Sequence, residues 1–197
     1  MIKDILRPTL AALALTGLAT TAAEAQNTAP APADPAAGTT AAAAATAPKA
    51  VGSYKSWAAY TFEDGGRLMC YSQSAPTGSL GEADGRGPAA AMVIQAPDAA
   101  AKDQVSIVLG FAPKSDKSIA LTIGSRPGRG KKFTLKKFAV GRAWAETGNQ
   151  DKQIVAALKR YNYLVVDAVS EKGEKVRDTY NLSGFSDAYD AAVKACR

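Results

Sequence analysis

Apolar residues at every second position constrain the fold of this chain more than any other feature. Two such runs are Val105, Ile107, Leu109 and Phe111, and then Ile119, Leu121 and Ile123. Successive side chains of a strand point to opposite faces of a sheet, so a period of two places all the apolar ones on one face. The pattern predicts half-buried antiparallel strands.

Further strand-like segments lie on both sides of these runs, separated by turn residues. They cover residues 54–62, 67–74, 91–95, 131–140, 161–169 and 176–182. Asp64-Gly65-Gly66 predicts a hairpin between the first two, because such turns match the twist of paired strands. In 131–140 the apolar parity changes near Lys136 and Lys137, which predicts a β-bulge. The Gly-rich stretch 77–87 is expected to be a long mobile loop.

Two segments have a helical period instead. The first covers about 151–160, with Asn149 or Gln150 near its start. The second covers about 184–195 and has Ser183 as its expected N-cap. Its apolar stripe consists of Phe185, Ala188, Tyr189, Ala192, Val193 and Cys196. We therefore predict a mainly β fold, an antiparallel β-sandwich or barrel-like domain with two α-helices.

The first residues have the pattern of a secretory signal peptide. Lys3 and Arg7 precede a short apolar run, and Ala23-Glu24-Ala25 supplies the small residues of a cleavage site. The apolar run is shorter than the roughly twenty residues that a membrane-spanning helix needs. We therefore expect residues 1–25 to be cleaved after Ala25, no transmembrane segment, and a protein that is periplasmic or secreted.

Residues 26–50 consist mainly of Ala, Pro and Thr. A segment without aromatic or branched apolar side chains buries too little surface to offset the entropy of ordering, so we expect a disordered linker. Residues 51–197 then form one domain of ordinary size. The first fifty residues contain three basic and three acidic groups, so the formal net charge of +6 belongs to this domain.

The chain has two cysteines, Cys70 and Cys196. In an oxidising compartment an isolated pair is most simply explained by one disulfide. The alternative is a reactive thiol, but neither cysteine has a histidine or a Cys-x-x-Cys partner that would lower its pKa. Cys196 also lies on the apolar stripe of the second helix, which favours a structural disulfide.

The chain contains no histidine, the commonest general base and a common zinc ligand. Ser-His-Asp and Cys-His mechanisms are therefore excluded. No Ser-x-x-Lys sequence or carboxylate signature replaces them, and we expect Asp167 and Asp178 to be hydrogen-bonded structural residues. Residues 124–131 resemble a phosphate-binding loop with the wrong glycine spacing. We predict no catalytic residue, no metal site and no cofactor, and so a protein that is not an enzyme.

The main candidate site is a basic segment, residues 126–142, with seven Lys or Arg residues and no acidic one. Its candidate anion-binding residues are Arg126, Arg129, Lys131, Lys132, Lys136 and Lys137. Such a density of charge suits an anionic partner, for example lipid A phosphates, an acidic polysaccharide or a phospholipid surface. Lysines also protect edge strands from aggregation, so a solvated edge hairpin is the alternative. Export argues against nucleic acid as the partner.

A second set of candidates is aromatic. It consists of Tyr54, Trp57, Tyr60 and Phe62. These side chains could line a ligand groove, but aromatic residues in strands more often belong to the core. We therefore expect them at core positions.

The order of motifs along the chain resembles the invasion-associated locus B family. The motifs are Trp57, Arg67-Leu68-Met69-Cys70, the strand 105–111, Ala143-Trp144-Ala145, Asp151, the segment from Asp178 to Ala188, and Cys196. The segment from Asp178 to Ala188 is the most specific part, together with the two cysteines. Within it, Gly184 permits a sharp turn from strand to helix, which makes the motif a folding element.

The resemblance implies a periplasmic, outer-membrane-associated or secreted protein, named for a role in host-cell invasion and virulence, and it implies no catalytic residues. Together with the basic segment, it predicts a non-catalytic envelope protein that binds an anionic or macromolecular partner of the envelope or host surface. The alternative is a periplasmic small-ligand-binding or chaperone-like module that uses an apolar cavity.

Overall fold

The computed structural model describes residues 47–95 and 103–197, which belong to one compact unit. The expected signal peptide, residues 1–25, and most of the expected linker, residues 26–50, lie outside the described residues. Strand β1 (Lys49–Tyr54) begins two residues before the expected domain boundary. Lys49 pairs with Thr61 of the next strand, and backbone pairing of this kind needs no particular side chain.

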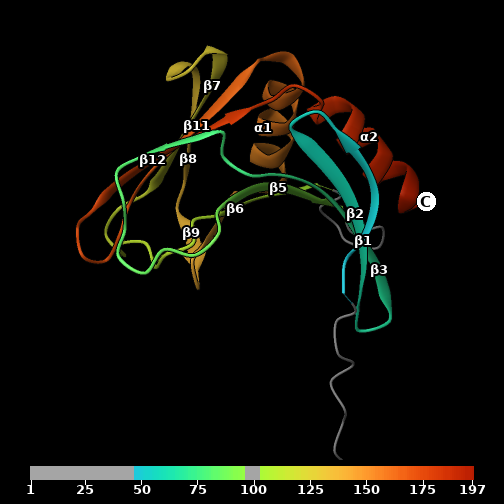
Figure 1. The fold of residues 1–197 in the computed structure, drawn as a ribbon, viewed down its shortest axis with the longest axis horizontal. Helices are drawn as coiled ribbons and strands as arrows, with labels where there is room; N and C mark the ends of the chain where they lie inside the picture. The colour runs from blue at the N-terminus through green and yellow to red at the C-terminus, as the bar shows by residue number, and fades with distance from the viewer. Residues whose placement is uncertain (1–46, 96–102) are drawn as a thin grey trace, which may run out of the picture. The chain divides into compact units, whose positions relative to one another are not determined.

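The described strands form two antiparallel sheets, and neither closes into a barrel (Figure 1). The seven-stranded sheet has the order β1, β2 (Trp57–Asp64), β3 (Arg67–Ser74), β5 (Ala90–Gln95), β6 (Gln104–Val108), β10 (Arg142–Trp144) and β9 (Lys137–Ala139). The five-stranded sheet has the order β4 (Gly78–Leu80), β12 (Lys175–Asn181), β11 (Tyr163–Val169), β7 (Ile119–Arg126) and β8 (Arg129–Leu135). The mainly β, sandwich-like class is confirmed.

The inward faces of the two sheets share one core with the helices. Its largest fully buried side chains include Trp57, Tyr180, Phe185, Ile107, Leu109, Ile119, Leu121 and Ile123. The alternating apolar residues therefore do point into the core, as predicted. The strand β6 is shorter than expected, because it ends at Val108 and not at Phe111. Gly110 has a φ of 77°, a left-handed conformation that ends the strand before Phe111. Leu109 stays buried because the chain bends at this point and does not leave the core.

Two expectations about the strands were wrong. The parity change near Lys136 is no bulge, because β8 ends at Leu135 in one sheet and β9 begins at Lys137 in the other. A change of sheet reverses which parity faces the core. The segment 77–87 is no free loop either, because β4 within it pairs with β12 along the edge of the five-stranded sheet.

The two helices lie where their period predicts. Helix α1 (Gly148–Arg160) contacts β6 and β7, which belong to different sheets, and helix α2 (Phe185–Ala195) lies against β1, β2 and β3 (Figure 1). The N-cap of α1 is Thr147, whose hydroxyl accepts from the Gln150 N–H at 3.2 Å, so this helix begins before the expected start.

The N-cap of α2 is Gly184, so the expected cap at Ser183 was wrong. Gly184 has a φ of 89°, and a Cβ there would lie 1.8 Å from the Tyr54 carbonyl oxygen. Only glycine fits this close approach. The same turn packs on the start of β2, because the Trp57 Nε1–H donates to the Asn181 carbonyl at 3.0 Å and the Trp57 ring meets Phe185 edge-on at 4.8 Å.

A disulfide joins Cys70 of β3 to Cys196 at the end of α2, with 5.9 Å between the Cα atoms. Beside it, Ala59 and Ala192 form a second, small buried cluster with Cys70. The predicted disulfide is confirmed, and it fixes the C-terminal end of the helix to the seven-stranded sheet.

Removing this disulfide should cost much of the stability. The bridge spans 126 residues, and closing so long a loop in the unfolded chain is worth about 5 kcal/mol in the chain-entropy model. We expect C70S/C196S to lower the free energy of unfolding by about this amount in urea titrations. An unchanged urea midpoint in the double variant would contradict the expectation.

Asp151 gives a pH-dependent contribution to stability. Its side chain is 4% exposed and accepts a hydrogen bond from the Val105 N–H at 2.7 Å, which ties α1 to β6. Burial raises the pKa of the Asp151 carboxyl, although the Val105 N–H opposes the rise. The folded protein therefore holds this proton more tightly than the unfolded chain, and stability from this group falls as pH rises through the folded pKa.

D151N should remove that pH dependence. The amide is neutral at every pH and its oxygen can still accept from the Val105 N–H. We expect the unfolding free energy of D151N, relative to the wild type, to increase as pH rises from about 4 towards 7. Urea titrations at several pH values measure this difference. Parallel pH profiles for the two proteins would show that the carboxyl does not titrate as its burial predicts.

Candidate functional site

The basic segment begins in the hairpin of β7 and β8. Arg126 pairs with Arg129 across the turn, and the register shifts between Ile123 and Arg126. At this shift a Cβ on Gly124 would lie 1.7 Å from the Arg129 carbonyl oxygen, so glycine permits the irregular crossing. Such irregularities increase the local twist of a hairpin. We call the four exposed cations Arg126, Arg129, Lys131 and Lys132 the basic tip.

The cations of the basic tip point in more than one direction. Lys131 lies opposite Ile123 and Lys132 lies opposite Thr122, and neighbouring residues of a strand face opposite sides. Because β8 is the edge strand of its sheet, charges on both of its faces reach solvent. The basic tip is thus an exposed charged ridge, and a partner would have to wrap around it.

Lys136 and Lys137 lie apart from the basic tip. They are five and six residues beyond Lys131, which corresponds to roughly 16 Å along an extended chain, at the point where the chain changes sheet. The Lys137 ammonium donates to the Glu146 carbonyl at 2.9 Å. Lys136 lines a cleft of about 330 Å³ with Ser115, Asp116, Lys117, Ser118 and Phe138. Lys117 lies outside the basic segment in the sequence, so its place beside Lys136 could not be predicted. The pairing of β7 with β8 brings the two lysines to the same cleft.

The basic tip is electrostatically uncompensated. Among the described residues there are five ion pairs, and their cations are Arg86, Lys117, Lys159, Lys172 and Arg177. No cation of the basic tip takes part in an ion pair or a side-chain hydrogen bond with another described residue. Unpaired like charges on one hairpin raise the local positive potential and attract anions.

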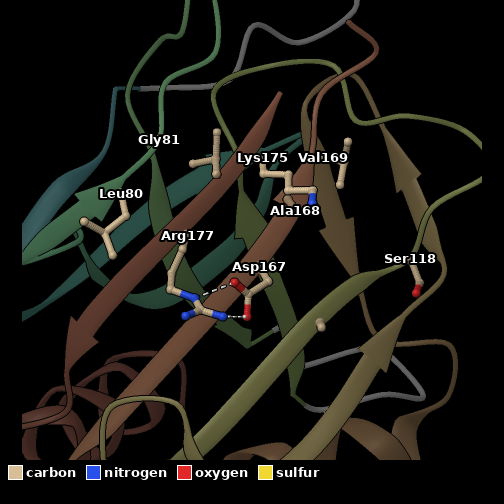
Figure 2. Close-up of a pocket in the computed structure, with 10 residues that line it drawn as sticks. Leu80, Gly81, Ser118, Asp167, Ala168, Val169, Lys175 and Arg177 are labelled. Atoms are coloured by element: carbon tan, nitrogen blue, oxygen red, sulfur yellow. Dashed lines mark hydrogen bonds and ion pairs between the residues drawn. The ribbon is translucent and has the colours of Figure 1, made fainter. Parts of the chain in front are cut away.

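A shallow groove lies on the outer surface of the five-stranded sheet (Figure 2). Its volume is about 430 Å³, and its walls come from β4, β11, β12 and the start of β7. In Figure 2 the guanidinium of Arg177 faces the carboxylate of Asp167, with N–O distances of 2.6 and 3.2 Å. These two charged groups satisfy each other, so they are not poised for a ligand.

The aromatic candidates divide between two faces. Trp57 is buried in the core and Tyr54 is half-buried against it, as expected. Tyr60 and Phe62 are not core residues, because they lie on the other face of the seven-stranded sheet and contact Tyr71. The expectation of core positions was therefore wrong for these two.

Three further observations concern metal ligands, membrane-spanning helices and thiols. Among the described residues, no group of three or more carboxylates or cysteines is arranged to hold a metal ion. Within the same residues, no helix is long and apolar enough to cross a membrane. The two cysteines form the disulfide and carry no free thiol.

Comparison with known proteins gives the family. Residues 57–193 match the family model described as invasion associated locus B protein. The chain belongs to the invasion-associated locus B family. The crystal structure of invasion associated protein B from Bartonella henselae has the same fold, with a TM-score of 0.50 and 16% identity over 76% of this chain and 98% of that one. No curated protein matches the chain.

The segment 178–188, which lies within the region matched by the invasion-associated locus B model, has a structural role in this fold. Asp178 is 2% exposed, forms an ion pair with Arg86 and accepts from the Ser79 hydroxyl at 2.7 Å. Arg86 also donates to the Leu109 carbonyl at 3.0 Å. Tyr180 is fully buried, and burial together with the Asp178 charge raises the pKa of its phenol. Asp178 thus holds the segment after β4 against the core.

Asp178 and Asp167 provide a matched pair of variants. D178N removes a buried ion pair and leaves the Arg86 guanidinium, which is 15% exposed, facing an amide. We expect a loss of about 3 kcal/mol in the free energy of unfolding. D167N removes the more exposed pair with Arg177 and should cost less than about 1 kcal/mol. Equal losses in urea titrations would contradict a distinct role for Asp178.

Proposed function

We propose that this member of the invasion-associated locus B family is an exported, non-catalytic envelope protein that binds an anionic macromolecule through its basic tip. The observation that supports the proposal is the set of four exposed, unpaired cations on the β7–β8 hairpin. The formal net charge of +6 acts in the same direction, because it attracts polyanions over a longer range.

Export is supported by two independent features. Residues 1–25 have the signal-peptide pattern with a cleavage site after Ala25. The Cys70–Cys196 disulfide is the kind of bond that persists in oxidising compartments such as the periplasm or the cell exterior. The proposal therefore places the protein in the periplasm, at the outer membrane or outside the cell.

The arrangement of charge favours an extended polyanion as the partner. Lys131 and Lys132 face opposite sides of an edge strand, and the turn adds two arginines, which bind carboxylate or phosphate in bidentate fashion. An acidic polysaccharide or a phosphorylated glycan of the envelope or host surface can follow such a ridge. The same lysines also keep β8 from pairing with another sheet, and the two roles are compatible.

Charge reversal tests the proposal. In R126E/R129E/K131E/K132E each substitution removes two units of charge, which takes the formal net charge from +6 to −2. The control K49E/R67E/K152E/K175E makes the same change at exposed cations elsewhere. We expect binding to a purified acidic polysaccharide and to envelope extract to weaken at least about tenfold at low salt in the first variant only.

Other results have defined meanings. Equal weakening in both variants would mean that net charge alone attracts the partner and that the basic tip is not a site. Undiminished binding in the tip variant would leave the lysines of β8 with the single role of protecting an edge strand. Unfolding midpoints of both variants, compared with the wild type, show whether either result reflects loss of the fold.

A further inference from the structure

The outer face of the seven-stranded sheet carries an apolar surface that the proposed function does not use. The strand register places Tyr60, Tyr71 and Ile94 in one row across β2, β3 and β5. It places Met92 and Trp144 in the next row, on either side of Ser106. We call Tyr60, Phe62, Tyr71, Met92, Ile94 and Trp144 the aromatic platform.

Both helices pack on the opposite face of this sheet. Helix α2 meets it at Ala59 and Cys70, and helix α1 is bonded to it through the Val105 N–H. Those residues have the other parity from the platform residues, so they point to the other side. None of the platform side chains belongs to either buried core cluster.

The platform is organised by contacts between its own side chains. The rings of Tyr60 and Tyr71 stack at 5.1 Å with 18° between their planes, and Phe62 meets Tyr71 edge-on at 5.7 Å. Tyr71 is 7% exposed and Met92 is 8% exposed, and the other four side chains are partly exposed. A surface made of packed rings and flanked by methionine and isoleucine costs little entropy when it binds an apolar ligand, because it is already ordered.

One end of the platform is basic. Register places Lys137 opposite Trp144, and Arg142 lies two residues before Trp144 on the same face of β10. Burial raises the pKa of the Tyr71 phenol, and the positive charge of Arg142 opposes this rise. Among the paired strand residues of this face, the acidic side chain is Asp64, which is opposite Arg67 at the far end. Glu146 follows Trp144 by two residues, and its backbone carbonyl accepts a hydrogen bond from Lys137.

We propose that this face binds a single anionic lipid, with the acyl chain across the aromatic platform and the phosphate at Arg142 and Lys137. From β2 to β10 is four strand spacings, about 19 Å, which is comparable to an extended acyl chain. Aliphatic side chains at the centre favour an acyl chain over a sugar, because buried sugar hydroxyls need polar partners. This proposal does not depend on the basic tip.

Fluorescence quenching by a brominated lysophosphatidate, a single-chain lipid with a phosphate headgroup, tests the proposal in the intact protein. The chain has two tryptophans, and Trp57 is 2% exposed, so contact quenching reports on Trp144. We expect saturable quenching that W144F abolishes. K137E/R142E should weaken the affinity at least about tenfold, whereas R126E/R129E, which alters the basic tip by the same charge, should leave it unchanged.

Several outcomes would overturn the proposal. One is equal quenching by a brominated lysophosphatidylcholine of the same chain length, which would show that the phosphate charge is not recognised. Others are unchanged affinity in K137E/R142E, and quenching only by sealed phosphatidylglycerol vesicles, which would indicate docking on a membrane surface. Absence of quenching, with an acidic polysaccharide altering Trp144 emission instead, would indicate a glycan platform.

Discussion

The rest of the fold depends on the packing of the turn between β12 and α2 against the start of β2. Gly184 lies so close to the Tyr54 carbonyl that any side chain there would collide with it. Trp57 then contacts the turn twice, by its indole N–H and by the edge of its ring. These contacts join the five-stranded sheet, which contains β12, to the seven-stranded sheet, which contains β2. The family motif is therefore explained by packing and needs no catalytic role.

Local periodicity predicted most elements, and it failed where the chain changes direction or sheet. The apolar stripe from Phe185 onwards predicted α2 because one face of that helix is buried. Near Lys136 the apolar residues move from odd to even positions, and this change has two explanations. A β-bulge and a move of the chain into the other sheet both change which positions face the core. The short strand β4 has no apolar alternation of its own. Its place comes from pairing with β12, which is nearly a hundred residues away in the sequence.

The candidate site shows the same limit. Six cations that are close in sequence suggested one patch, but an extended strand separates Lys136 and Lys137 from the basic tip. The aromatic platform had no local signal, since its rows combine side chains from β2, β3, β5 and β10. Strands such as β5 are apolar on both parities, and that feature is the one that could have indicated a second apolar face. Such surfaces become visible only when the strand order is known.

The position of the disulfide sets an order of events during synthesis and folding. Cys70 precedes Cys196 by 126 residues, so β2 and β3 emerge long before the helix that covers them. Throughout that interval the chain has no second thiol of its own with which Cys70 could mispair. Oxidation within the molecule can therefore follow only the arrival of α2, and the closed bridge marks a chain in which this helix is already present. A product that stops before Cys196 would keep a free thiol on Cys70, which remains open to thiol–disulfide exchange.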